Sequence, residues 1–455
     1  MASYKWKNRK KSTSSLRVIN KNAAGLDLHA DSIFASAKEQ PVRTFETFTD
    51  SLYQLRDYLV EHGVRTVAME ATGVYWVQVY QVLEEAGLEV CLINGAEARN
   101  LPGRKTDVKD CEWIRQLHSF GLLRASFVPE EQIRQLRSYM RWRADMIRHA
   151  GDQILHMHKA LDLMNIKVHR VISDLTGASG RAIIEAILEG ERNPHKLLKL
   201  CDPQIIKKKA AQVVRSLQGD WRQEQLFALK QAYQCWQFYQ QKIRECDEQL
   251  GALLEKISGS KPQEQTLDDF KAMKPSKNSP RIEELHQMLV SLNGGCDATV
   301  LPGMGDYNVL KVIAEVGTDL SRWASVKHFV SWLKLAGGHN QSGKGFKRLR
   351  RHAVTPGGQI FREAAQVIGN SKDTALGAFY RRLRARKGPK VAIVATARKL
   401  ATLYYRLMTK GIDYVEEGVR RYEERHRHQR IKALNRLSKE LGYSLVPNAT
   451  AAEVH

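Results

Sequence analysis

Four acidic residues have the types and positions needed to hold divalent cations: Asp27, Glu70, Asp107 and Asp110. Asp107 and Asp110 are three residues apart, so on a helix they share one face. Carboxylates gathered at one point repel one another unless a hard cation neutralises them, and Mg²⁺ prefers oxygen ligands of this kind. The chain around them is strongly basic, with a formal net charge of +23. Together these features predict a Mg²⁺ site that faces a polyanion.

Strand and helix signals alternate from residue 17 to about residue 128, and the elements they predict must position these acids. Apolar runs and period-two alternation predict five strands and three helices. The strands are at 23–29, 32–37, 43–49, 66–70 and 89–93, and the helices are at 51–61, at 74–86 and after Asp107 through Trp113. This order predicts an α/β layer with mixed strand pairing. Asp27 then lies in the first strand and Glu70 ends the fourth, so both can point to the same edge of the sheet.

Each acid also has a structural explanation when it is considered alone. Asp27 could cap a turn, Glu70 could end a strand, and Asp107 could be the N-cap of the helix that follows it. Together, an acid in the first strand, an acid ending the fourth and a helical pair match the arrangement of RNase H and RuvC nucleases. In that arrangement two divalent ions about 3.5–4 Å apart position a phosphodiester for in-line attack. Three basic side chains beside the pair are candidates for phosphate contacts, although a solvated charge run explains them nearly as well: Arg104, Lys105 and Lys109.

The amino-acid composition indicates which classes of molecule the protein binds. The 455 residues are 43% hydrophobic and 27% charged, which is typical of a globular protein with two or three domains. The excess of 72 Lys and Arg over 49 Asp and Glu indicates a polyanion, most often nucleic acid, although a ribosomal role or an anionic membrane would also fit the charge. No apolar run reaches the ~18 residues of a membrane span. Six scattered cysteines without a CxxC pair favour reduced thiols in a cytoplasmic protein and argue against zinc.

A heptad seam runs through the helical region that follows residue 129, because apolar residues recur there every seven positions: Leu229, Trp236, Ile243, Leu250 and Ile257. Gln240 and Asp247 interrupt the seam. A long helix that packs inside its own domain would give the same pattern. We expect instead a partner helix from a second copy of the chain, and hence a homo-oligomer, either a dimer or a tetramer.

A glycine-containing turn opens the C-terminal region at Leu301-Pro302-Gly303-Met304-Gly305. Gly303 and Gly305 would expose backbone N–H groups that can grip a phosphate, as in helix-hairpin-helix modules, although a plain helix-entry turn carries the same letters. The segment 343–390 then holds thirteen Lys and Arg against two acidic residues, a density that favours phosphate contact. Its first candidates are Lys344, Lys347, Arg348, Arg350 and Arg351.

Ser342 is a possible nucleophile, since it lies in a glycine-rich stretch in which the backbone can approach a phosphate closely. A serine hydroxyl is a weak nucleophile until a base or a metal activates it. His339 is three residues away, but proximity in sequence does not establish a pair. Judged on the motif alone, a flexible turn with a hydroxyl in solvent explains these letters better.

Several stretches resemble the DEDD recombinases of the insertion-sequence-110 family: residues 25–29 (GLDLH), 69–76 (MEATGVYW), 101–110 (LPGRKTDVKD), 121–124 (GLLR), 301–305 (LPGMG), 342–344 (SGK) and 397–400 (ARKL). The resemblance implies a RuvC-like domain, a coiled coil and a C-terminal transposase domain with a catalytic serine. It implies that the four acids bind Mg²⁺ and that Ser342 forms a covalent link to a DNA phosphate. Relatives often carry a proline and an aromatic residue before the serine, where this chain has residues 338–341 (GHNQ).

The predicted division has six parts: a basic flexible arm (1–16), a RuvC-like DEDD domain (17–128), a helical, coiled-coil region (129–257), a polar linker around one short helix (258–298), a mainly helical transposase domain with the serine (299–414) and a charged helical tail (415–455). On this resemblance we expect a site-specific DNA recombinase that transposes an insertion sequence in the bacterial or archaeal cytoplasm, associated with the nucleoid. A noncoding guide RNA would pair with donor and target DNA, and the carboxylates and the serine would form a composite site. The alternatives are a RuvC-like nuclease or junction resolvase that uses water, and a non-catalytic nucleic-acid-binding protein.

Overall fold

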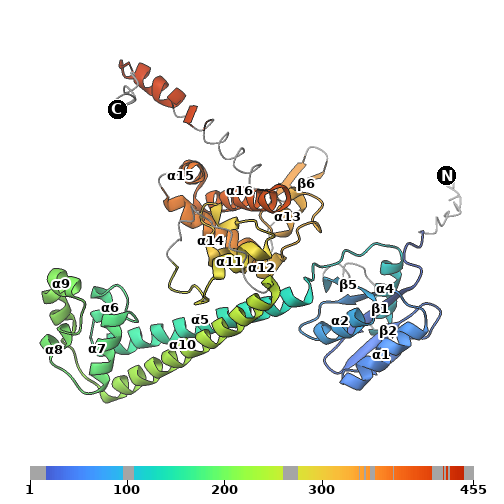
Figure 1. The fold of residues 1–455 in the computed structure, drawn as a ribbon, viewed down its shortest axis with the longest axis horizontal. Coiled ribbons are helices and arrows are strands. Elements are labelled where there is room, and N and C mark those ends of the chain that lie inside the picture. Colours follow the sequence, from blue (N-terminus) through green and yellow to red (C-terminus); the bar gives the residue numbers. More distant parts are fainter. Residues whose placement is uncertain are drawn as a thin grey trace, which may run out of the picture. The chain divides into compact units, whose positions relative to one another are not determined.

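The computed structural model describes residues 17–95, 107–259, 275–337, 339–342, 345–348, 354–371, 374–411, 424, 427–428 and 431–444, and only the backbone in 339–342 and 345–348. The chain divides into two compact units, residues 1–128 and 129–455 (Figure 1). Among the helices that the structure describes, none combines the length and the apolar character that crossing a bilayer requires.

A five-stranded mixed sheet forms the centre of the first unit. Its strands are β1 (Ala23–Leu28), β2 (Ser32–Ser36), β3 (Arg43–Glu46), β4 (Thr66–Glu70) and β5 (Glu89–Ile93). They lie in the order β3-β2-β1-β4-β5, with β2 antiparallel to both of its neighbours and β1, β4 and β5 parallel. The predicted strands and their mixed pairing are confirmed. β3 ends three residues earlier than predicted, because the chain turns there into the first helix.

Helices cover both faces of this sheet. On one face α1 (Thr49–Glu61) and α2 (Trp76–Glu85) pack on Leu26, Leu28 and Met69. On the other face Ile114 of α4 (Asp107–Ser119) packs on Ala68 and Ile93. Successive side chains of a strand point to opposite faces. Every second residue of β1 and β4, including Asp27 and Glu70, therefore faces α4. This architecture is consistent with a RuvC-like N-terminal domain.

The second unit begins with two long helices that pack along each other, α5 (Glu131–Leu163) and α10 (Gln223–Ser258) (Figure 1). Four short helices connect them: α6 (Val168–Val171), α7 (Ala178–Leu188), α8 (Pro194–Leu198) and α9 (Pro203–Ser216). These helices share one core with the end of α5 and the start of α10, so the two long helices run antiparallel.

The heptad seam of α10 packs on α5 of the same chain, so the seam by itself does not require a partner helix from a second copy. Leu229 and Trp236 belong to the same core as Met157 of α5. The seam position that looked spoiled, Asp247, is buried and accepts a hydrogen bond of 2.5 Å from Arg143 Nε of α5. A long amphipathic helix shows the same period whether its partner lies in the same chain or in another. The seam therefore gives no argument for an oligomer.

The C-terminal part of this unit is mainly helical. Its elements are α11 (Leu285–Leu292), the 3₁₀ helix η1 (Ala298–Val300), α12 (Asp306–Val316), α13 (Val326–Trp332), β6 (His339–Ser342), β7 (Gly345–Arg348), α14 (Pro356–Asn370), α15 (Ala375–Lys387) and α16 (Pro389–Lys410). The short helix predicted within the linker is α11, and its Leu285, Met288 and Leu289 are buried. Phe329, Phe361 and Tyr404 are fully buried at the centre of this part. The tail contains a further exposed helical stretch at 431–440.

Candidate active site

The four predicted acids come together beside one end of the sheet. β1 and β4 are parallel neighbours in which Leu26 lies opposite Met69, so the next residues, Asp27 and Glu70, lie at the same level on the face toward α4. α4 begins at Asp107, which places Asp107 and Asp110 in its first turn. The prediction that Asp27 and Glu70 lie at the same edge of the sheet is thus confirmed, and α4 places Asp107 and Asp110 beside them.

A glycine lets α4 lie directly on β1. A Cβ atom at Gly25 would overlap with backbone atoms of Cys111 and Arg115, so no larger residue fits there without moving the helix. Two polar contacts fix the helix in this position. Arg115 Nε donates to Ser36 Oγ at 3.0 Å, and the buried His118 shares a hydrogen bond of 2.8 Å with Thr66 Oγ1.

The pKa of the Asp27 carboxyl reflects the proximity of the other three acids. Burial raises the pKa of the Asp27 carboxyl above its usual range, His29 lowers it, and the charges of Asp107, Asp110 and Glu70 raise it further. A carboxyl whose pKa is raised by burial and by three neighbouring acids is stabilised as an anion when a cation binds among them. The side chain of Asp107 is 52% exposed, which leaves the cluster open to solvent on that side.

His29 joins this cluster, although the sequence reasoning assigned it no role. Its Nε2 atom lies 3.4 Å from Asp27 Oδ2 and 3.6 Å from Asp107 Oδ1. One ligand atom from each of Asp27, His29 and Asp107 fits within 4.8 Å of the others, a spacing at which three side chains can hold one metal ion. The sequence did contain a signal: Asp27 and His29 are two residues apart at the end of a strand, so they point to the same face.

Glu70 is positioned by a second glycine. A Cβ atom at Gly95, just after β5, would overlap with the Glu70 carboxylate. The carboxylate therefore rests against the bare backbone of residue 95. The close packing at Gly25 and Gly95 could not be read from the sequence, because a close backbone approach depends on which elements meet.

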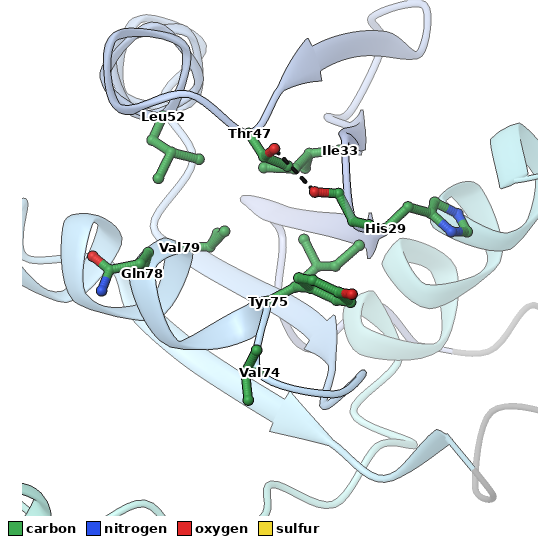
Figure 2. Close-up of a pocket in the computed structure, with 10 residues that line it drawn as sticks. His29, Ile33, Thr47, Leu52, Val74, Tyr75, Gln78 and Val79 are labelled. Atoms are coloured by element: carbon green, nitrogen blue, oxygen red, sulfur yellow. Dashed lines mark hydrogen bonds between the residues drawn. The ribbon is translucent and has the colours of Figure 1, made fainter.

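A cavity of about 260 Å³ lies on the side of the sheet covered by α1 and α2, opposite the face that carries Asp27 and Glu70 (Figure 2). Its lining is mostly apolar: Leu28, His29, Ala30, Ile33, Thr47, Leu52, Val74, Tyr75, Gln78 and Val79. Figure 2 shows the His29 imidazole pointing away from the other lining side chains. His29 thus contributes its backbone to the cavity and its ring to the carboxylate cluster.

The predicted nucleophile lies in a β-hairpin of the second unit. Ser342 is the last residue of β6 and pairs with Gly345, the first residue of β7. The sequence did not predict these two strands, because four-residue strands with few apolar side chains leave little periodic signal. The side chain of Ser342 lies outside the described residues.

The predicted phosphate contacts are described only in part. Lys109 is an exposed residue of α4, and Lys347 and Arg348 lie on β7, where only the backbone is described. The remaining basic candidates lie outside the described residues: Arg104, Lys105, Lys344, Arg350 and Arg351.

The two glycines of the turn before α12 have different structural roles. Gly303 has a φ of 75° and packs against α14 near Ala364, while Gly305 is the N-cap of α12 and has an ordinary φ. The turn is thus needed for packing between α12 and α14, whatever else it contacts.

Comparison with known families gives matches to both units. Residues 24–166 match a family model described as a transposase, of the DEDD type found in IS110 elements. Residues 298–381 match a model described as a transposase of the IS116/IS110/IS902 family. No curated protein matches the chain. The carboxylate cluster and the hairpin with Ser342 both fall inside matched segments. The chain is thus similar to IS110-family transposases in two separate segments, which supports a divalent-metal-dependent enzyme that cleaves and rejoins DNA.

Proposed function

We propose that this protein is a site-specific DNA recombinase that transposes an insertion sequence. The observation that carries the proposal is the convergence of Asp27, Glu70, Asp107 and Asp110 at one end of a mixed sheet, within a segment that matches a transposase family. The formal charge of +23 supports a nucleic-acid substrate. Binding to DNA alone would not need four carboxylates in one place, because carboxylates repel phosphates.

The residues present fit a divalent cation. The Asp27 carboxyl has a raised pKa among like charges, and the buried His29 Nε2 atom has no hydrogen-bond partner among the described residues. Asp27, Glu70, Asp107 and Asp110 would hold Mg²⁺. When bound, the ion would supply positive charge that offsets the charge developing on a phosphodiester during strand cleavage. The protein's part is to hold these carboxylates on β1, β4 and α4.

Ser342 is the proposed nucleophile. Its Oγ atom would bond to the scissile phosphorus while the bond from phosphorus to the departing nucleotide oxygen breaks. The hydroxyl proton passes to solvent, and the departing oxygen takes up a proton. In the reverse step a DNA hydroxyl attacks the phosphoserine and Ser342 leaves with a proton, so strands are rejoined without a high-energy cofactor. Gly338 and Gly343 lie on the two sides of residues 339–342 in the sequence, and they support close approach of a phosphate to Ser342.

Sequence choice belongs, on this proposal, to a noncoding guide RNA that pairs with donor and target DNA. The protein itself would contact backbones through Lys109 and the basic residues around Ser342. We further propose that the carboxylates and Ser342 act in one reaction in a homo-oligomer. This last point rests on the family resemblance, since the heptad seam no longer argues for it.

The serine mechanism can be tested against hydrolysis by water. The protein is incubated with Mg²⁺, DNA carrying the element's ends and RNA transcribed from the element's flanks, and the products are separated under denaturing conditions. We expect a covalent protein–DNA band for the wild type and for a Ser331→Ala control, whose exposed serine lies on α13. Ser342→Ala should give neither the band nor cleavage. Full-rate cleavage by Ser342→Ala would leave only the nuclease alternative, for which the first unit supplies a complete set of carboxylates.

A further inference from the structure

His29 stands apart from the other site residues, because it is a nitrogen donor among carboxylates. It follows β1 directly, and its backbone is fixed on both sides. Its N–H donates to Ser32 O at 2.9 Å, and Thr47 Oγ1 donates to Ala30 O at 3.1 Å (Figure 2). Its ring meets Phe34 edge-on, with the ring centroids 5.9 Å apart. These contacts fix the backbone at His29 and one edge of its ring, while 42% of the side chain stays exposed.

The distances from His29 Nε2 to its two carboxylate neighbours do not fit hydrogen bonds. At 3.4 and 3.6 Å, they exceed the ~2.7–3.2 Å of an N–H···O bond. They are close to the spacing of two ligands of one ion: with metal–ligand bonds of about 2.1 Å, neighbouring ligand atoms are roughly 3.0–3.5 Å apart, a range that includes the Asp27 distance and lies 0.1 Å below the Asp107 distance. The Nε2 atom is also buried and lacks a hydrogen-bond partner among the described residues. A buried nitrogen without a partner destabilises the fold unless something binds it.

We propose that His29 Nε2 is a metal ligand, that Asp27, His29 and Asp107 hold one divalent ion together, and that this nitrogen makes the site prefer Mn²⁺ to Mg²⁺. The proposal rests on the carboxylate metal site of the proposed function and adds a ligand and a selectivity to it. Mg²⁺ favours an all-oxygen shell and gives up its water reluctantly, whereas imidazole suits transition-metal ions. Glu70 and Asp110 remain as oxygen ligands for a second, Mg²⁺-type position.

The competing explanation is that His29 is an imidazolium that balances the two carboxylates. The two explanations predict opposite effects of removing the ring. If His29 is a ligand, its loss weakens Mn²⁺ binding. If it is a resident cation, its loss removes a positive charge that competes with the metal, and Mn²⁺ and Mg²⁺ then both bind more tightly.

The test uses Mn²⁺ alone as the probe of the full-length chain, with calorimetry for affinity and pulsed electron paramagnetic resonance for bound nitrogen. We expect a ¹⁴N modulation on protein-bound Mn²⁺ in the wild type and its loss in His29→Gln. His29→Gln should bind Mn²⁺ about tenfold or more weakly, while its Mg²⁺ affinity changes by less than about threefold. His29→Asp replaces the nitrogen by an oxygen ligand. It should keep a bound ion, lose the ¹⁴N signal and reverse the preference toward Mg²⁺.

His62→Gln is the matched control, because His62 lies at the end of α1 with its Nδ1 atom 2.7 Å from Tyr58 O and takes no part in the cluster. Wild-type Mn²⁺ binding without a ¹⁴N signal would overturn the role of His29 and leave the carboxylate site standing. Tighter metal binding by His29→Gln would also overturn it. A wild-type chain that binds no Mn²⁺ and no Mg²⁺ would overturn the metal site itself. Circular dichroism melts of each variant show that these readouts come from folded protein.

Discussion

Gly25→Ala is expected to disable the site without touching any of its ligands. The added Cβ would lie 2.9 Å from Arg115 Cα, whereas carbon atoms in contact are about 3.5–4.0 Å apart. α4 must therefore move away from β1 by about 0.6 Å at that atom, and further at Arg115 N and Cys111 O, which would be closer still. Asp107 and Asp110 move with the helix, so two of the four carboxylates leave the positions set by Asp27 and Glu70.

A shift of about 1 Å in a catalytic group lowers rates by about 100-fold, and strain from overpacking costs about 1–3 kcal/mol. We expect both effects for Gly25→Ala, together with a weaker affinity for divalent ions. The assays are calorimetric Mn²⁺ binding, strand cleavage and urea unfolding. Gly151→Ala is the control, because a Cβ at this α5 position meets no atom within 4 Å. It should keep wild-type binding and cleavage. Wild-type metal affinity and cleavage in Gly25→Ala would refute the reasoning that α4 is positioned by this close approach.

Three further predictions follow from the contacts. Gly95→Ala places a methyl group where the Glu70 carboxylate lies, so calorimetry should show metal affinity reduced about tenfold while urea unfolding changes by less than about 1 kcal/mol. Asp247→Ala leaves the buried Arg143 guanidinium without its carboxylate and should destabilise the second unit by about 3–5 kcal/mol in urea unfolding. Burial lowers the pKa of His118. In mildly acidic solution the imidazole therefore binds a proton in the unfolded chain but not in the folded chain. Stability should thus fall as pH drops below about 6.5, and His118→Gln should flatten that fall.

Each of these predictions has an outcome that contradicts it. Unchanged metal binding in Gly95→Ala would mean that Glu70 is no ligand. An Asp247→Ala protein that unfolds at the wild-type urea concentration would show that Arg143 finds another partner. If wild type and His118→Gln lose stability equally between pH 7.5 and 5.5, the acid sensitivity has its source in other groups.

The sequence was sufficient to predict those helices and strands of the fold that have strong local patterns. The apolar runs of β1 and β4 predicted strands that bring Asp27 and Glu70 to the same edge of the sheet, and the three-residue spacing of Asp107 and Asp110 predicted their shared side of a helix. All four acids could be placed because each depends on one element and its period.

The rest depended on which elements meet, and no local pattern carries that information. The heptad period of α10 is the same for a partner in the chain and for one outside it, and only the fold identifies α5 as the partner. Asp247 looked like a defect in the seam because its counter-ion, Arg143, is about a hundred residues away in the sequence. Gly25 and His29 belong to the stretch 25–29 that resembles the family. Their roles become visible only when the position of α4 is known.

The central claim is that Ser342 makes the covalent bond to DNA while the carboxylates hold the metal. The most direct test is to identify the amino acid left on DNA after a reaction stopped by denaturant, by digesting the protein and the DNA and sequencing the nucleotide-bearing peptide by mass spectrometry. We expect a nucleotide phosphate on Ser342 in the wild type and none in Asp107→Asn, whose metal site is impaired. Efficient strand cleavage with no linked peptide, or with a link to any other residue, would contradict it.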